Sequence, residues 1–287
     1  MTIHPAYCID GPALVSFSGG RTSAYMLHEI TRAHDGKLPD DVYVCFANTG
    51  KEREETLHFV QECGSRWGVR IQWLEWRDTT DGFEEVGFNS ASRAGEPFAA
   101  LIAKKNFLPN AVTRYCTSTL KVRTISSFAK QALGWKHWTS VIGLRYDEGH
   151  RVLKAIDRNE QRKDPWRTVM PLSKAKIIKA DVLAFWARQP FDLALKSYEG
   201  NCDLCFLKAR AKLAALMREN PGMEGWWIEQ EASIAPNKPS GARFVTEYAY
   251  ADLARQVREQ GHLFDGFVDD NEEHDAECGL TCMGAVA

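Results

Sequence analysis

Three apolar runs alternate with two stretches of helical character in the first part of the sequence. The apolar runs occupy residues 13–18, 40–50 and 69–76, and the helical stretches occupy residues 21–34 and 51–68. Each run is short and nearly continuous in apolar residues, which is typical of a strand that is buried on both faces. Alternation of such strands with helices predicts an α/β fold, in which a parallel, Rossmann-like sheet carries helices on both faces.

The rest of the chain is expected to extend this domain and then to change in character. The pattern predicts one more strand over 136–144, and helices over 97–105, 119–133, 173–193 and 208–220. We expect residues 1–195 to form a nucleotide-binding α/β domain. Residues 196–287 are expected to form a Cys-rich helical region and a mobile tail that pack on the same domain.

Net charge and hydropathy indicate which classes of partner the protein is not expected to bind. The 287 residues carry a formal net charge of −2, so no chain-wide attraction to nucleic acid or to an anionic membrane is expected, although the segment RNEQRK at 158–163 is locally basic. No apolar run approaches the roughly 18 residues of a membrane-spanning helix, and the first residues lack the pattern of a secretory signal. The sequence therefore predicts a cytoplasmic protein with reduced thiols and no membrane partner.

Small residues join the first strand to the first helix. They are Ser18, Gly19, Gly20, Arg21, Thr22 and Ser23. Backbone N–H groups and hydroxyl groups at the start of a helix can hold a phosphate, and a plain tight turn is the alternative. The junction is neither a Walker A loop nor a GxGxxG motif. The second strand ends in Asn48, Thr49 and Gly50, so both segments fall at the carboxyl ends of strands, where ligands of parallel sheets collect.

Eight cysteines in a reducing compartment need an explanation other than disulfides. Cys45 lies within an apolar run and is expected to be a small buried hydrophobe. Five others are Cys116, the pair Cys202 and Cys205, and the pair Cys278 and Cys282. Two cysteines separated by two residues fit a redox pair, half of a zinc site or half of an iron–sulfur site.

Six segments of the chain are similar to motifs of one protein family. They are SFSGGRTSAYMLHEI, CFANTGKEREETLHFV, YCTSTLKV, GLRYDEGHR, GNCDLCF and ECGL. Together they resemble the phosphoadenosine-phosphosulfate reductases of the adenine-nucleotide alpha-hydrolase superfamily. The resemblance implies that residues 18–23 hold the phosphates of an adenine nucleotide or sulfonucleotide and that residues 48–50 meet its adenosine part. It also implies that the guanidinium groups of Arg145 and Arg151 grip an anionic group.

The same resemblance assigns roles to the cysteines. It implies a [4Fe–4S] cluster, with zinc as the alternative, on Cys116, Cys202 and Cys205. Cluster-bearing relatives have two adjacent cysteines where this chain has one, so a fourth ligand must come from elsewhere, and Cys282 is favoured. Cys278 then matches the nucleophile that attacks the sulfur of a sulfonucleotide, with a thioredoxin-like thiol as the reductant. Two alternatives stay open: Cys278 is itself the ligand, or the two tail cysteines form a redox pair.

Two positions depart from the family pattern. Thr22 stands where the family has the aspartate of Ser-Gly-Gly-x-Asp-Ser, and Asn48 stands where the second motif has an aspartate. Loss of the loop carboxylate disfavours cleavage of Mg-ATP, whereas sulfonucleotide binding is still expected.

The leading prediction is therefore a sulfonucleotide reductase-like oxidoreductase. The second is an ATP-pyrophosphatase-type sulfur-transfer enzyme that acts on nucleic acid, similar to proteins of DNA phosphorothioation or tRNA thiolation. The third is a nucleotide-binding module without chemistry. Tryptophans at 73–76 and 226–227 are expected in the core rather than as stacking platforms for bases.

Overall fold

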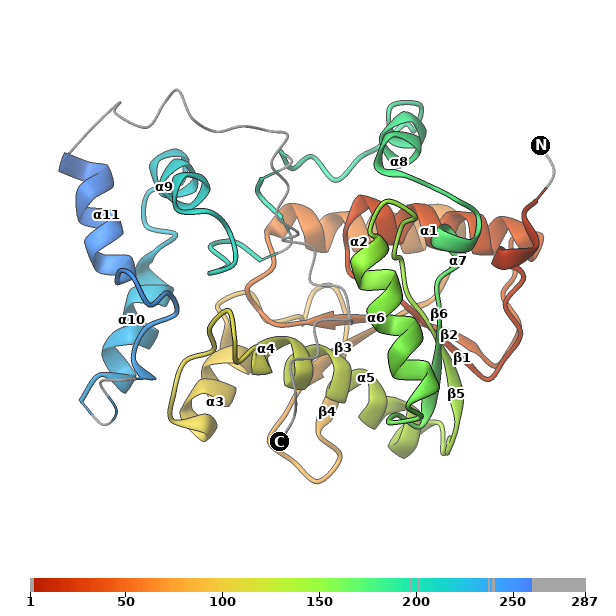
Figure 1. Ribbon diagram of the computed structural model, residues 1–287, viewed down its shortest axis with the longest axis horizontal. Coiled ribbons are helices and arrows are strands. Elements are labelled where there is room, and N and C mark those ends of the chain that lie inside the picture. Colours follow the sequence, from red (N-terminus) through yellow and green to blue (C-terminus); the bar gives the residue numbers. More distant parts are fainter. Residues whose placement is uncertain (1–2, 197, 201, 237, 239–240, 260–287) are drawn as a thin grey trace.

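The computed structural model describes residues 3–196, 198–200, 202–236, 238 and 241–259. Within those residues, a six-stranded sheet has the order β4-β3-β2-β1-β5-β6 (Figure 1). Neighbouring strands are parallel except for β3 and β4, so the predicted parallel sheet is confirmed, with one antiparallel strand at its edge. The strands are β1 (Ala13–Ser16), β2 (Val42–Asn48), β3 (Ile71–Trp76), β4 (Phe83–Val86), β5 (Trp138–Val141) and β6 (Trp166–Val169).

Helices cover both faces of the sheet, with α1 and α2 along one side and α3, α4 and α5 along the other (Figure 1). The helices of this part are α1 (Arg21–Ala33), α2 (Glu54–Trp67), α3 (Glu96–Lys105), α4 (Tyr115–Thr117), α5 (Thr124–Ser127), α6 (Gly149–Glu160), α7 (Pro171–Lys174) and α8 (Lys179–Trp186). Three shorter segments are the 3-10 helix η1 (Pro5–Tyr7) and the π-helical turns η2 (Ser118–Arg123) and η3 (Phe128–Ala132).

The packing of β2 explains why both faces are covered. Val44 and Phe46 belong to a hydrophobic cluster with Leu27 of α1, whereas Cys45 packs on the opposite face with Ile125 of α5. A strand that buries side chains on both faces needs a nearly continuous apolar run, which is the pattern its sequence has. Cys45 is fully buried, as predicted, and its burial raises the pKa of the thiol.

The C-terminal helices have a core of their own. α9 (Arg210–Glu219), α10 (Gly225–Ile234) and α11 (Tyr250–Glu259) lie at the end of the molecule away from the N-terminus (Figure 1). In their core the rings of Trp227 and Tyr250 stack, with centroids 5.4 Å apart. The same cluster takes in Phe98 of α3 and Tyr115 of α4, so these helices pack against the segment that follows the first four strands. Trp73, Trp76, Trp226 and Trp227 all pack in or against hydrophobic clusters, as predicted.

Two predicted helices are divided in the structure. The helix predicted over 119–133 begins earlier, at Tyr115, and runs through α4, η2, α5 and η3, so that two of its stretches are π-helical. The helix predicted over 173–193 is replaced by α7 and α8. These are separate because Lys176 adopts a φ of 57°, a left-handed conformation that a right-handed helix cannot include.

The sequence pattern does not predict β4, β6 or α6. Each of the two strands is four residues long and carries charged residues, so neither has the apolar run that marks the inner strands. In α6 only Ala155 is buried, so this helix lacks the broad apolar face of a core helix.

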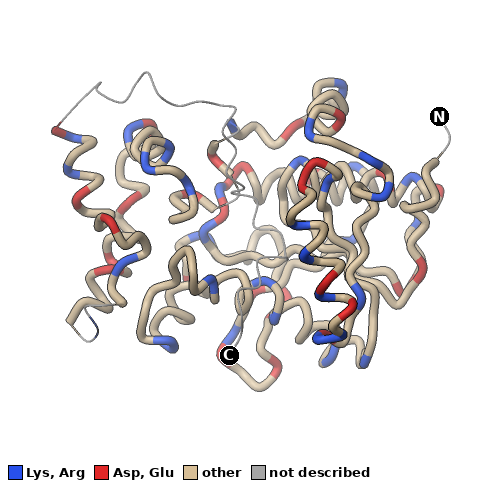
Figure 2. Tube along the Cα trace, viewed as in Figure 1, with Lys and Arg blue, Asp and Glu red and all other residues tan. Residues whose placement is uncertain are grey.

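Charges of both signs are interspersed along the chain (Figure 2), in keeping with the small net charge. Among the described helices, none combines the length and the apolar character needed to cross a membrane.

Candidate functional site

The loop between β1 and α1 brings backbone N–H groups to the carboxyl edge of the sheet. Gly20 is the N-cap of α1 and offers no side chain to its first turn, so the first N–H groups of the helix lack intrahelical partners. The Ser23 hydroxyl accepts from the Ser18 N–H at 3.2 Å, donates to the Gly20 carbonyl at 2.9 Å and lies 3.0 Å from the Ser18 hydroxyl. The small residues thus form a tight loop at a helix start, the arrangement that suits a phosphate.

Within this loop, Gly19 is the position at which a side chain would be most unfavourable. Its φ is +79°, and a Cβ added there would lie 2.6 Å from the Thr56 methyl carbon. Gly36 has a similar φ of +86°, but a Cβ there would meet no atom within 4 Å. We expect Gly36→Ala to lower the free energy of unfolding by about 1 kcal/mol, for backbone strain alone, and Gly19→Ala by about 3 kcal/mol, since overpacking is added. Urea denaturation of both variants measures the difference, and equal losses would contradict the loop packing.

Arg145 connects the end of β5 to this loop. It is 7% exposed, its Nη1 donates to the Thr22 hydroxyl at 3.1 Å and its Nε donates to Asp147 at 3.0 Å. Glu148 accepts from the Arg145 backbone N–H at 2.8 Å and pairs with Arg151 as well. The structure therefore places Arg145 beside the loop, where Thr22 accepts one of its hydrogen bonds, and joins Arg151 to Arg145 through Glu148.

Arg21 has a different role from the other loop residues. Its Nε and Nη2 donate to the Asp192 carboxylate at 2.7 and 2.6 Å, and Nη2 also donates to the Leu195 carbonyl at 3.1 Å. Burial raises the pKa of Asp192, but the hydrogen bonds from Arg21 and from the Leu193 N–H, together with the positive charge of Arg21, outweigh burial, and the pKa lies below its usual value. The guanidinium group thus holds the segment after α8, and it is the N–H of Arg21 that belongs to the loop.

The end of β2 explains why an amide replaces a carboxylate there. Asn48 is fully buried, and its Nδ2 donates to Glu75 at 2.6 Å and to the Ser92 carbonyl at 2.9 Å. Its Oδ1 accepts from the Gly50 N–H at 3.1 Å. An aspartate would face the buried Glu75 carboxylate with like charge, so the neutral side chain suits this chain's own surroundings.

The segment after Asn48 is joined directly to the segment that carries the cysteine pair. Lys51 forms an ion pair with Asp203 at 2.8 Å, and the Asp203 N–H donates to the Lys51 carbonyl at 2.9 Å. Glu52 and Cys202 form an isolated antiparallel bridge, and the Cys202 Sγ lies 4.0 Å from Glu52 Oε1. The same carboxylate oxygen is 3.5 Å from the Nζ of Lys121, in η2. Three separate parts of the chain thus meet at Glu52.

Lys208 holds the cysteine segment in shape. The residue is 5% exposed, and its Nζ donates to the carbonyls of Cys202 at 2.5 Å, Asp203 at 2.6 Å and Glu199. An ammonium group has three donors, and here each donor has a carbonyl. Burial lowers the pKa of Lys208, and negative charge on Cys205 and Cys202 opposes this shift.

Three of the predicted cluster ligands, Cys116, Cys202 and Cys205, are among the described residues, and all three lie near the hydrophobic cluster of the C-terminal helices. Cys202 and Cys205 belong to the segment held by Lys208, and Cys116 packs against the hydrophobic cluster that includes Leu204. Within the described residues, no three His, Cys, Asp or Glu side chains form a group that could hold a metal ion. Cys278 and Cys282, the predicted nucleophile and fourth ligand, lie outside the described residues.

The electrostatics around the cysteine segment suit thiolate ligands. Its buried or half-buried neighbours among the described residues include four cations, Lys51, Arg53, Lys121 and Lys208. Carboxylates pair with the first three of them: Asp203 with Lys51, Glu55 and Glu199 with Arg53, and Glu52 with Lys121. Cysteine sulfur atoms are the usual ligands of an iron–sulfur cluster, and four thiolates give it net negative charge, so the neighbouring cations suit it.

The sequence analysis did not predict the residues that join the end of β2 to the cysteine segment at 202–205. Glu52, Lys51, Lys121 and Lys208 were not among the predicted site residues, although the first three fall inside or next to quoted motifs. Charged residues within an otherwise buried segment are the signal that points to them, because such groups are rarely buried without a partner. The His28 ring lies 3.0 Å from Glu29 and packs on Trp67, which is a structural role.

Comparison with known proteins is consistent with this geometry. Residues 12–189 match the model of the phosphoadenosine phosphosulfate reductase domain. The chain is 30% identical over 223 residues to the uncharacterized nin region protein ORF290 of Escherichia phage lambda, covering 74% of this chain and 71% of the relative. It is 24% identical over 226 residues to the uncharacterized protein MJ0066 of Methanocaldococcus jannaschii, covering 76% of this chain and 41% of that protein.

A solved structure, the U34-tRNA thiolase NcsA from Methanococcus maripaludis with its [4Fe–4S] cluster, aligns with a TM-score of 0.40 and 12% identity. The alignment covers 88% of this chain and 72% of the thiolase chain. The domain match spans well over half of the chain, and the phage relative is matched over most of its length. The chain belongs to the phosphoadenosine phosphosulfate reductase domain family.

Proposed function

We propose that this protein is a reductase of adenine sulfonucleotides. The observation that carries the proposal is the direct connection of residues 48–52, at the nucleotide edge of the sheet, to the cysteine segment at 202–205 through Lys51, Glu52 and Asp203. A nucleotide held at that edge has a sulfur-bearing segment of the protein as its neighbour. Family membership supplies the class of ligand.

In the proposed complex, residues 18–23 bind the phosphate nearest the ribose through backbone N–H groups. Arg145 and Arg151 bind the terminal sulfate, because Arg145 lies beside the loop and shares the Glu148 carboxylate with Arg151, and the anion would replace that carboxylate in part. Residues 48–50 bind the adenosine part.

The proposed reaction has two steps. The Cys278 thiolate attacks the sulfur of the sulfonucleotide, an S–S bond forms, the bond from sulfur to the phosphate oxygen breaks, and the nucleotide leaves with the electron pair. A dithiol of the thioredoxin class then supplies two electrons, releases sulfite from the thiosulfonate and is oxidised to a disulfide. Cys278 is outside the described residues, so its role rests on the motif it belongs to.

Cys116, Cys202 and Cys205 are proposed to hold a [4Fe–4S] cluster, with Cys282 as the fourth ligand and zinc as the alternative metal. When bound, the cluster would polarise the sulfate beside it. This chain's own contribution is the ion pairs of Lys51 with Asp203 and of Lys121 with Glu52, together with the hydrogen bonds from Lys208 to three carbonyls, which orient the cysteine segment.

The absence of a carboxylate at position 22 favours a sulfonucleotide over Mg-ATP as the substrate. In the structure the Thr22 hydroxyl accepts from Arg145, so this position lies next to a cation that suits an anionic substrate group. A magnesium-bound triphosphate would instead call for one or two carboxylate ligands from the protein beside the phosphates and water.

The test is anaerobic turnover of adenosine and phosphoadenosine phosphosulfates with a dithiol donor, measured as sulfite release. Arg145→Lys keeps the charge but loses the bidentate fork, so we expect KM to rise about tenfold while the unfolding midpoint stays near that of the wild type. Arg188→Lys, on an exposed position, serves as the control. Pyrophosphate release from ATP that is stimulated by nucleic acid, without sulfite release, would instead favour the sulfur-transfer reaction.

A further inference from the structure

A cavity lies on the face of the sheet opposite to α1. It has a volume of about 310 Å³ and is bounded by β5, β6, α6 and the helical stretch around Ile125. This volume is at the lower end of the range for small-molecule sites, which suits a ligand of one or two rings. None of the residues of the nucleotide edge lines it.

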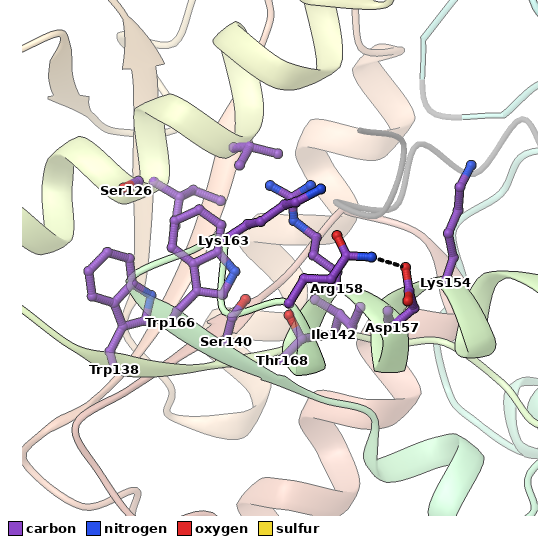
Figure 3. A pocket seen from close by; sticks show the side chains of 14 residues that line it. Ser126, Trp138, Ser140, Ile142, Lys154, Asp157, Arg158, Lys163, Trp166 and Thr168 are labelled. Atoms are coloured by element: carbon purple, nitrogen blue, oxygen red, sulfur yellow. Dashed lines mark hydrogen bonds between the residues drawn. The ribbon is translucent and has the colours of Figure 1, made fainter. Parts of the chain in front are cut away.

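Aromatic rings form one end of the cavity. Trp138 and Trp166 occupy paired positions at the starts of β5 and β6, with ring centroids 5.3 Å apart and planes inclined by 30°. Trp138 is buried and Trp166 is half-buried. Figure 3 shows the two rings side by side at one end of the cavity, with Arg158 and Lys163 nearby and Lys154 toward the other end.

Cations, hydroxyls and the Asp157 carboxylate line the rest of the cavity. Arg158 is held in place by a two-pronged ion pair with Asp164, one bond of which is 2.8 Å long. Lys154 and Lys163 line the cavity and are exposed, and neither has an ion pair among the described residues. Ser140 and Thr168 add hydroxyl groups to the lining. The locally basic segment at 158–163 therefore contributes Arg158 and Lys163 to a cavity with an aromatic wall.

We propose that this cavity binds a nucleotide unit, with its base against Trp166 and its phosphate near Lys163 and Arg158. Stacking on an aromatic ring recognises any base, and the cations recognise the phosphate. The nucleotide is either free or an unpaired residue of a single-stranded nucleic acid, since both present the same base and phosphate. This inference does not depend on the reductase reaction proposed above.

The test uses uridine monophosphate, which lacks the adenine that the first site is proposed to bind, and a decauridylate strand. Binding to the full chain is measured by calorimetry, and the contact is located by photocrosslinking of bromouridine monophosphate followed by peptide mass spectrometry. We expect crosslinks on the peptides that carry Trp138 or Trp166. Trp166→Leu should weaken binding about tenfold through loss of stacking.

If Trp166→Leu does not fold, a matched pair of charge reversals still tests the proposal. Lys163→Glu should weaken binding about fivefold, more at low salt than at high salt, whereas Arg167→Glu should change it less than twofold. Arg167 is exposed and lies between Trp166 and Thr168 on β6, so its side chain points to the other face of the sheet.

Comparison of uridine monophosphate with decauridylate distinguishes a free nucleotide from a nucleic acid strand. Decauridylate binding that is much tighter than monophosphate binding, with the same crosslinked peptides, identifies a nucleic acid strand, and similar affinities identify a free nucleotide. Absence of saturable binding of either ligand, or crosslinks confined to the β1–α1 loop, would overturn the proposal. Equal effects of Lys163→Glu and Arg167→Glu would also overturn it.

Discussion

Replacement of Lys208 by methionine is expected to lower the free energy of unfolding by about 3 kcal/mol, because three buried carbonyl groups lose their donor together. Those carbonyls belong to Glu199, Cys202 and Asp203. Methionine fills a similar volume, so the loss reports on the hydrogen bonds rather than on packing. Chemical denaturation measures the effect.

The control for this substitution is Lys130→Met. Lys130 is exposed, and its replacement should change the free energy of unfolding by less than about 0.5 kcal/mol. A second consequence is local: with the hydrogen bonds from Lys208 removed, alkylation of Cys202 in iron-free protein should become faster, while alkylation of the fully buried Cys45 stays slow. If the Lys208→Met protein were as stable as the Lys130→Met protein, the stabilising role of the hydrogen bonds from Lys208 to the three carbonyls would be contradicted.

Glu52→Gln is the second change with a large expected effect. The Glu52 side chain is fully buried, accepts from the N–H and the hydroxyl of Thr49 at 2.8 Å each, and lies 3.5 Å from the Lys121 ammonium. Glutamine has the same shape but leaves Lys121 without this opposite charge. We expect a loss of about 2 kcal/mol in the free energy of unfolding. We also expect adenine-nucleotide affinity to fall about tenfold, because Thr49 and the cysteine segment would no longer be fixed relative to each other.

Glu62→Gln provides the matched control on the same part of the chain. Glu62 forms a surface ion pair with Arg66, and such pairs contribute about 0.5 kcal/mol or less on an exposed helix. Nucleotide affinity should be unchanged in this variant. If Glu52→Gln bound nucleotide as tightly as Glu62→Gln, the link between the two parts of the site would have no functional role.

The parallel sheet could be predicted from the sequence because its inner strands are buried on both faces. Such strands have no polar face, so the runs at 13–18, 40–50 and 69–76 are recognisable without tertiary information. β4 and β6 lie at the two edges of the sheet and carry charged side chains, so local pattern does not distinguish them from loops. The interruption at Lys176 depends on one backbone angle and leaves no mark on periodicity.

The candidate site was predictable only where it follows local chain geometry. The Ser-Gly-Gly loop and the Asn-Thr-Gly segment are consecutive residues at strand ends, so their chemistry is visible in the sequence. The meeting of Glu52 with Cys202 spans 150 residues, and the engagement of Arg21 by Asp192 spans 171. Contacts of that separation arise from packing of whole elements, which single-sequence patterns do not encode.

The central claim is that the nucleotide edge and the cysteine segment form one site. The most direct measurement is the visible spectrum of the anaerobically purified protein, with its iron content, during titration with an adenine sulfonucleotide. We predict about four iron atoms per chain and a saturable change in the spectrum, both lost in Cys202→Ser and both retained in Cys45→Ser. Protein without iron, or with a spectrum that bound nucleotide leaves unchanged, would contradict the claim.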